Sequence, residues 1–188
     1  MAAEKGLYLS AREIARFRTR IYRHYQTHGR SLPWRETRDP YAILVSEVML
    51  QQTQVARVLG KYGEFLARFP DFAHLAAAPL PEVLAAWQGL GYNRRALALK
   101  HLAVKVMAEH GGRLPRSEAA LRRLPGIGPG TAGAVLAFAF EEPAVFIETN
   151  IRRVFLHCFF PGQEGVRDRH LLPYVAATLD RRRVRPWY

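Results

Sequence analysis

The sequence predicts an all-α fold made of two helical lobes. Apolar residues recur at helical spacing along most of the chain, and glycines and prolines separate these periodic stretches. No stretch alternates polar and apolar residues well enough to indicate a β-strand. The chain has 188 residues, of which 49% are hydrophobic and 23% are charged, so it can form a substantial core.

The first predicted helix begins after Ser10, which forms a capping-box pattern with Glu13. It runs up to Gly29, and its apolar residues at helical spacing are Ile14, Phe17, Ile21 and Tyr25. Residues 30–38 are basic and contain a proline, and we expect a loop there.

The next lobe is expected to span residues 40–145. Asp39 and Pro40 supply an N-cap and a first-turn proline for a helix that runs through Met49. Gly89–Tyr92 is predicted to be a turn. The other helices expected here cover residues 54–69, 72–77, 81–88, 93–110, 117–124 and 131–140.

Two last helices are expected at residues 149–160 and 167–179. Together with residues 1–39, the segment 146–188 is predicted to form the second lobe.

The chain is strongly basic, with 28 Lys and Arg residues against 16 Asp and Glu residues and a formal net charge of +12. Such a charge indicates a polyanionic partner. No apolar run reaches transmembrane length, and the first residues do not resemble a signal peptide. Cys158 is the single cysteine, which excludes an intrachain disulfide and an all-cysteine metal site. We therefore expect a soluble, cytoplasmic monomer with no membrane partner.

The most informative segment is Leu124-Pro-Gly-Ile-Gly-Pro-Gly-Thr131. Its glycines allow a tight turn, and the helix that follows begins with free backbone N–H groups at its positive dipole end. These donors suit a phosphate oxygen. An ordinary corner between two helices is the alternative, but the length of the pattern and the net charge favour phosphate binding. The expected contacts are Gly126, Gly128, Gly130 and Thr131.

This segment resembles the hairpin of the helix–hairpin–helix DNA glycosylases. Leu32–Arg35, Ser46–Gln54 and Gly89–Tyr92 resemble motifs of the members that remove mispaired adenine. The resemblance covers about residues 12–188; the Ser46–Gln54 string is highly specific, whereas the hairpin identifies only the superfamily. It implies base excision from double-stranded DNA, bound in a cleft between the two lobes.

Hydrolysis of an N-glycosidic bond needs an acid for the leaving base and a carboxylate for the sugar cation. Glu47 lies among apolar helix residues, which should raise its pKa, and it resembles the family's acid. The alternative is a partly exposed glutamate on the helix's polar side. Glu148 opens a helix and stands where the family has aspartate, so its extra methylene changes the reach of the carboxylate. Glu148 could instead be only a good helix-start residue.

Gly130 stands where bifunctional relatives carry a lysine that forms a Schiff base. Glycine cannot do this, so hydrolysis without strand cleavage is expected. Adenine-specific relatives often carry Ser or Tyr at this position. Gly130 and Glu148 therefore keep open a second substrate, thymine or uracil mispaired with guanine. They also leave room for a DNA-binding module without turnover, or a basic scaffold for RNA.

By resemblance, Gln52 and Tyr92 are the residues that wedge into DNA when a base is flipped out, and Gln51 is a neighbouring candidate. A turn tyrosine packed on its neighbours is the alternative for Tyr92. Trp34 and Arg35 resemble the lining of the base pocket. Here the alternative is a tryptophan that covers the core beside a solvated arginine.

Four arginines could follow the DNA backbone or form solvated faces: Arg94, Arg95, Arg152 and Arg153. His24 and His28 lie one helical turn apart, but without a third ligand we expect a solvated face and no metal site. Many relatives carry a four-cysteine iron–sulfur loop, and we expect none here. Some hold a monovalent cation through hairpin carbonyls, which is possible here.

Adenine-specific relatives usually carry a further C-terminal domain, and we expect this chain to be a truncated or compact variant. If it is truncated, Ile14, Phe17 and Ile21 should lose part of their cover.

Overall fold

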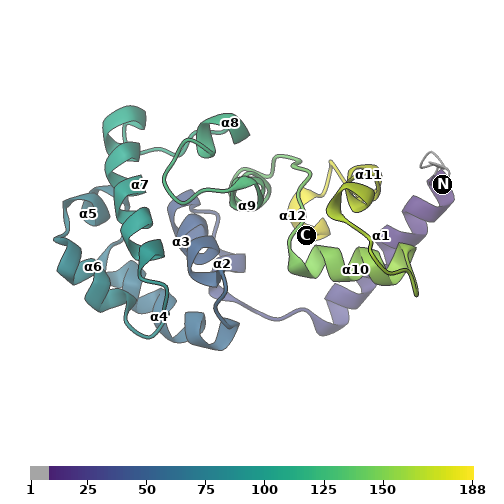
Figure 1. Cartoon of the computed structure of the whole chain (residues 1–188), viewed down its shortest axis with the longest axis horizontal. Helices are drawn as coiled ribbons and strands as arrows, with labels where there is room; N and C mark the ends of the chain where they lie inside the picture. The colour runs from purple at the N-terminus through teal and green to yellow at the C-terminus, as the bar shows by residue number, and fades with distance from the viewer. Residues whose placement is uncertain (1–8) are drawn as a thin grey trace. The chain divides into compact units, whose positions relative to one another are not determined.

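The computed structural model describes residues 9–188. These residues form α-helices and connecting segments, with no strand among them, which confirms the predicted all-α class (Figure 1). The chain divides into two compact units. One is Ser31–Phe140, the helical bundle; the other joins the N-terminal segment up to Arg30 with Glu141–Tyr188, and we call it the terminal unit.

The bundle begins at Ser31 rather than at residue 40, the boundary expected from sequence. Residues 30–38 are also not a simple loop, since α2 spans Pro33–Glu36. Pro33 occupies the first helical position, where its fixed φ favours a helical turn. Leu32 and Trp34 are buried, and the Trp34 ring meets Tyr62 edge-on at 5.4 Å. This packing attaches the segment to the bundle.

The helices of the bundle follow the predicted order. After α2 they are α3 (Pro40–Leu50), α4 (Val55–Arg68), α5 (Phe72–Ala77), α6 (Leu80–Trp87), α7 (Arg94–His110), α8 (Glu118–Leu121) and α9 (Pro129–Ala139).

Helices α3 and α9 pack against each other within the bundle (Figure 1). Both are apolar on nearly every side, as expected of helices that are buried all round. Residues 41–46 of α3 and 132–137 of α9 are buried. The small residues Ala132, Gly133 and Ala134 let α9 approach closely. Helix α7 covers α5 and α6.

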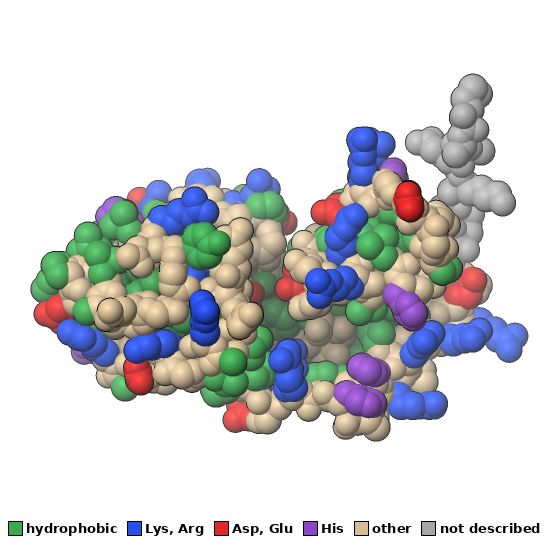
Figure 2. Space-filling view, turned by 60° about the horizontal axis from the view of Figure 1, so that its bottom comes forward, with side chains coloured by type: hydrophobic (Ala, Val, Ile, Leu, Met, Phe, Trp, Pro, Cys, Tyr) green, Lys and Arg blue, Asp and Glu red, His purple; other side chains and the backbone are tan. Residues whose placement is uncertain are grey.

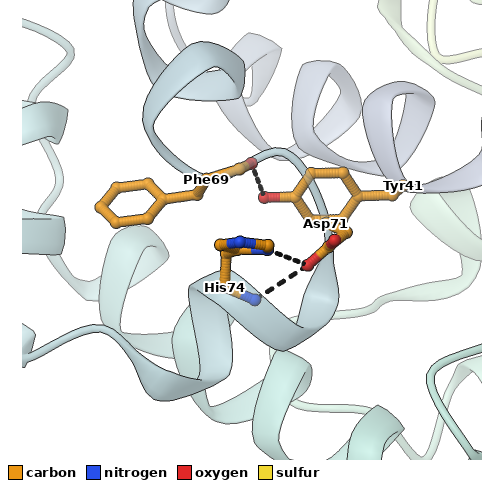
Figure 3. Close-up of polar contacts among 4 residues, drawn as sticks. All are labelled: Tyr41, Phe69, Asp71 and His74. Carbon is orange, nitrogen blue, oxygen red and sulfur yellow. Dashed lines mark hydrogen bonds and ion pairs between the residues drawn. The ribbon is translucent and has the colours of Figure 1, made fainter.

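The junction before α5 is tied to α3 by a buried hydrogen bond (Figure 3). The Tyr41 hydroxyl donates to the Phe69 carbonyl at 2.7 Å. Asp71 is the N-cap of α5, and its Oδ1 accepts from the His74 N–H at 2.8 Å, with His74 Nδ1 also at 2.8 Å. These bonds hold the pKa of Asp71 below its ordinary value, the backbone bond contributing most.

The terminal unit contains α1 (Ala11–His28), α10 (Thr149–Phe159), α11 (Asp168–Thr178) and α12 (Val184–Trp187). The capping box at Ser10 and Glu13 is confirmed, with the Ser10 N–H donating to Glu13 at 2.8 Å. The residue pattern predicted no helix after residue 179, so α12 was not expected.

Phe17 is covered by aromatic residues of α10. Its side chain is buried, and its ring lies 5.2 Å from Phe155 and 5.1 Å from Phe159. Ile14 and Ile21 are half-buried. The aromatic side of α10 therefore supplies much of the contact that α1 needs.

Arginines join the helices of the terminal unit. Arg18 of α1 donates to the carbonyls of Thr178 at 2.8 Å and Leu179 at 2.7 Å, at the C-terminal end of α11. Arg152 of α10 donates to Asp168 and to the Val166 carbonyl. Arg152 thus has an internal role that the sequence did not indicate.

Candidate functional site

Glu47 lies in α3 of the bundle and is half-buried, between the buried residues Ser46 and Val48. Its helix is fixed at the N-terminal end, where the Asp39 side chain accepts from the Tyr41 N–H at 3.0 Å. The Ser46 hydroxyl, 1% exposed, donates to the Ile43 carbonyl at 2.7 Å and so satisfies its own hydrogen bond. The carboxyl of Glu47 is therefore held on a largely buried, apolar helix.

The C-terminal end of α3 is held by Arg95, the second residue of α7. The Arg95 side chain is 6% exposed, and its guanidinium donates to the carbonyls of Val48 at 3.0 Å and Met49 at 2.8 Å. The last carbonyls of a helix have no partner within the helix, and they favour a nearby cation. Arg95 therefore caps the helix that carries Glu47. Neither of the two alternatives considered for Arg95, contact with a DNA backbone or a solvated face, fits a side chain that is buried in the bundle.

Gln52 and Tyr92, the two predicted wedge residues, have left-handed backbone conformations. Their φ angles are 55° and 49°, although neither residue is glycine. Such a conformation costs about 1–3 kcal/mol and is common at functional sites. Gln52 is exposed, as is Tyr92 with 54% of its surface accessible. Both side chains thus stand on exposed turns, as a wedge requires.

Gln51 is half-buried and contacts the hairpin helix. Its Nε2 atom donates to the Thr131 hydroxyl at 3.1 Å. This bond links the end of α3 to the first turn of α9. Gln51 and Thr131, both predicted to contact DNA, are thus brought together by the fold.

The hairpin runs from α8 to α9 and confirms the predicted helix–turn–helix order. Gly126 is left-handed, with φ of 77°, and an added Cβ there would lie 3.0 Å from the Ala98 Cβ. Gly128 is the N-cap of α9 with φ of −88°, so it needs no left-handed conformation. An added Cβ at Gly128 or Gly130 would meet nothing within 4 Å. The turn itself therefore requires only Gly126.

Helix α9 begins at Pro129, two residues before the predicted start. Gly130 and Thr131 consequently occupy the second and third helical positions, whose N–H groups have no partner within the helix. The first internal bond runs from the Ala132 N–H to the Gly128 carbonyl at 2.9 Å. With Gly128 exposed and no side chain at Gly128 or Gly130, a phosphate oxygen has room to approach these donors.

Glu148 lies in the terminal unit and is the N-cap of α10, as the sequence predicted. Its carbonyl accepts from the Arg152 N–H at 2.8 Å, and the residue is exposed. A carboxylate is favoured at a helix N-terminus by the helix dipole.

Trp34 and Arg35, the expected pocket residues, differ in exposure. Trp34 is a core residue packed on Tyr62, whereas Arg35 is exposed. The ring of Trp34 therefore contributes to the bundle core.

The described residues contain no group of three or more His, Cys, Asp or Glu side chains that could hold a metal ion. His24 and His28 are exposed and their rings stack at 4.5 Å. Cys158 is half-buried in α10, and burial raises the pKa of its thiol, which disfavours the thiolate that a metal needs. A single cysteine of this kind does not fit a four-cysteine iron–sulfur cluster. In the part of the chain that is described, no helix has the length and apolar character of a membrane span.

Arg95 is the residue whose importance the sequence reading missed. A signal was present: Arg95 shares one helical stripe with Leu99, Leu102 and Val106, all of which are buried. An arginine on the apolar stripe of a helix must find buried acceptors.

Comparison with known proteins identifies the family of this chain. Residues 45–170 match the family described as HhH-GPD superfamily base excision DNA repair protein, and the chain belongs to this family. It is 40% identical to the adenine DNA glycosylase of Mus musculus over 157 residues, which is 79% of this chain and 30% of that protein. The chain thus spans under a third of that relative's length.

A second relative is matched over more of its length. The chain is 35% identical to the thymine/uracil-DNA glycosylase of Methanothermobacter thermautotrophicus over 155 residues, covering 82% of this chain and 70% of that protein. The solved structure of a thermostable thymine-DNA glycosylase superposes with a TM-score of 0.85 and 31% identity, covering 94% of this chain and 82% of that one. Both of these proteins are named as DNA glycosylases.

Proposed function

We propose that this protein is a monofunctional DNA glycosylase of base excision repair, which removes a mispaired base from double-stranded DNA. Its substrate is adenine opposite 8-oxoguanine or guanine. One observation carries the proposal: Glu47 is half-buried on α3, in the same unit as the exposed turns of Gln52 and Tyr92 and the hairpin. The 40% identity to an adenine DNA glycosylase supports the choice of base.

In the proposed reaction, Glu47 gives a proton to the leaving base as its bond to the sugar breaks. Glu148 stabilises the positive charge that develops on the sugar, and a water molecule adds to the same carbon. The water loses one proton as it adds, so Glu47 can be reprotonated. The products are a free base and an abasic site. Gln52 and Tyr92 fill the space that the flipped nucleotide leaves.

The hairpin is proposed to hold a DNA phosphate. Gly126 shapes the turn, and the N–H groups of Gly130 and Thr131 supply the donors beside Gly128. Gln51 supports Thr131. Trp34 and Arg35 line the base pocket in this proposal, with Arg35 as the exposed member of the pair. A monovalent cation held by hairpin carbonyls is part of this proposal. If the affinity for duplex DNA is equal in potassium and in tetramethylammonium salts, the cation is not needed and this part of the proposal is refuted.

Strand cleavage is not part of the proposed activity, because Gly130 has no amine to form a Schiff base. We expect the DNA strand to break only after alkali treatment, and borohydride to trap no covalent complex. A trapped complex or cleavage without alkali would show that another amine serves as nucleophile.

Thymine or uracil opposite guanine is the second candidate substrate. The match covers 70% of the thymine/uracil relative but only 30% of the adenine relative, which favours this candidate. Gly130 and Glu148 also depart from the adenine-specific pattern.

Single-turnover assays on labelled duplexes test these alternatives. The duplexes carry adenine opposite 8-oxoguanine, adenine opposite guanine, or thymine or uracil opposite guanine. Product from one duplex identifies the base. Tight binding without product from any duplex would favour a DNA-binding module, and stronger competition by RNA than by DNA would favour an RNA scaffold.

A further inference from the structure

We infer that Arg95 is a positioning residue, which sets the spacing of the Gln52 and Tyr92 turns relative to the helix of Glu47. This inference rests on the proposed function. One buried side chain would thereby fix the relative positions of three parts of the site, which are the end of α3, the turn at Gln52 and the turn at Tyr92.

The guanidinium of Arg95 contacts oxygen atoms from each of these parts. Nη1 donates to the carbonyls of Val48 and Met49, at the end of α3, and to the carbonyl of Gln51. Nη2 donates to the Thr53 hydroxyl at 2.8 Å. The residues on both sides of Gln52 are therefore bonded to the same side chain.

Nη2 also reaches the second turn, which precedes Tyr92. It donates to the carbonyls of Leu90 at 3.1 Å and Gly91 at 3.0 Å. The Thr53 hydroxyl lies 3.3 Å from the Leu90 carbonyl, which adds a direct bond between the two turns. Because four hydrogens on the two Nη atoms serve six oxygens, several of these bonds are shared.

The aromatic neighbours of Arg95 complete the arrangement. Its guanidinium lies 5.5 Å from the Trp87 ring and 5.5 Å from the Tyr92 ring. Trp87 Nε1 in turn donates to the Gly91 carbonyl at 3.1 Å. Tyr92 is thus contacted both through the backbone before it and through its ring.

This geometry has a mechanical consequence. Gln52 and Tyr92 have left-handed backbone conformations, which are strained for residues other than glycine. The hydrogen bonds from Arg95 to carbonyls in each turn oppose relaxation of these conformations. The planar fork of arginine carries five donors in a fixed geometry, whereas the lysine ammonium has only three donors on a flexible stem and can serve fewer of these oxygens. Misplacement of a catalytic group by about 1 Å can lower a rate about 100-fold.

The experiment compares Arg95→Met and Arg95→Lys with a matched control, Lys100→Met. Lys100 lies on the same helix, and its ammonium donates to the carbonyls of Ala76 at 2.9 Å and Leu75 at 3.4 Å, away from the two turns. All variants are assayed at a temperature where circular dichroism shows them folded. Base extrusion is followed by 2-aminopurine fluorescence in the target duplex, and base removal by single-turnover rate.

We expect Arg95→Met to lower both extrusion and rate by about 10-fold or more, with Arg95→Lys between it and wild type. Lys100→Met should stay within about twofold of wild type. A double-mutant cycle with Tyr92→Ala adds a readout that a general loss of stability does not change. If Arg95 acts through Tyr92, the fold decrease in single-turnover rate caused by Arg95→Lys must be smaller in the Tyr92→Ala background than in the wild type. Equal factors in both backgrounds would overturn the inference.

Amide hydrogen exchange of the free protein separates this inference from the proposed function. Exchange in residues 50–53 and 89–92 should rise together in Arg95→Lys and remain unchanged in Lys100→Met. Unchanged exchange in Arg95→Lys would overturn the positioning role whatever the enzyme does. If the wild-type protein neither extrudes nor removes a base from any of the duplexes, the proposed function is refuted instead.

Discussion

At the scale of single residues, the candidate site combines a half-buried glutamate with two residues in left-handed backbone conformations. Glu47 sits on a helix capped at one end by Asp39 and at the other by Arg95. Gln52 and Tyr92, two and forty-two residues beyond the end of that helix, are left-handed and exposed. Residues that are unfavourable for stability and exposed to solvent are typical of functional sites.

Replacing Glu47 with Gln should remove turnover while leaving DNA binding within about twofold of wild type. The amide keeps the shape of the carboxyl but cannot donate its proton, so a loss of about 100-fold or more in single-turnover rate is expected. Binding is measured by fluorescence anisotropy on the same duplex. An unchanged rate in Glu47→Gln would show that another group protonates the base.

Replacing Gln52 with Gly should raise stability and lower activity. Glycine adopts φ of 55° without strain, so the free energy of unfolding should rise by about 1 kcal/mol. Loss of the side chain removes the proposed wedge, and base extrusion should fall.

Glu141→Gly is the matched control for that variant, because Glu141 also has φ of 55° and lies in the terminal unit. It should gain similar stability and keep wild-type activity. Gln52→Gly with full activity would argue against a wedge at this position.

At the scale of secondary-structure elements, helix ends decide the arrangement. Arg95 caps α3, Arg18 caps α11, and Asp71 caps α5. The exposed start of α9 lies beside two glycines with open space around them. Helix ends thus both fix the fold and present donors to a ligand.

The start of α5 should give stability a dependence on pH. The folded state lowers the pKa of Asp71, so its contribution is fully present above the unfolded value and is lost as pH falls through the folded value. Chemical unfolding from about pH 5 to about pH 2 measures this loss. Asp71→Asn keeps an N-cap but does not titrate, so its stability should fall less steeply over that range. Identical slopes would contradict the assignment.

The start of α9 should be sensitive to a single methyl group. In Gly128→Ala the new Cβ meets no protein atom within 4 Å, so the fold should be retained. The methyl group would stand beside the proposed phosphate donors and weaken DNA binding by about tenfold. Gly60→Ala of α4, where the added Cβ also meets nothing, is the control and should bind normally. Equal affinities of the two variants would exclude the hairpin contact.

At the scale of the whole molecule, the positive charge should dominate binding to DNA. The net charge is +12, and Lys and Arg side chains are spread over both units in Figure 2. Such a distribution suits a long polyanion, which is held mainly through its phosphates.

The affinity for duplex DNA should therefore fall steeply with salt. Between 50 mM and 200 mM salt, proteins that make about 6–10 phosphate contacts lose roughly 10³- to 10⁵-fold in affinity. We expect a linear plot of log K against log salt, with similar slopes for mismatched and matched duplexes, because bases contribute little to counterion release. A slope near zero would contradict the proposed mode of binding.

The sequence by itself determined the helical class, the order of the helices and most of their ends. Capping and apolar periodicity act within a few residues, as at Ser10, Asp39 and the helix that Glu148 opens, so they can be read locally. The motifs around Glu47 and the hairpin likewise indicated the family, which the comparisons confirmed. The cleft expected between the lobes, and the roles of the site residues in it, stay predictions.

Only the tertiary structure decided which way several side chains point. Arg95 faces the bundle interior, Trp34 packs on Tyr62, and Gln51 bonds to Thr131, eighty residues later in the chain. The short helix α2 forms as part of that packing. The physical reason is that burial and hydrogen-bond partners come from residues distant in sequence, and a buried cation is tolerated only where the fold brings enough oxygens around it.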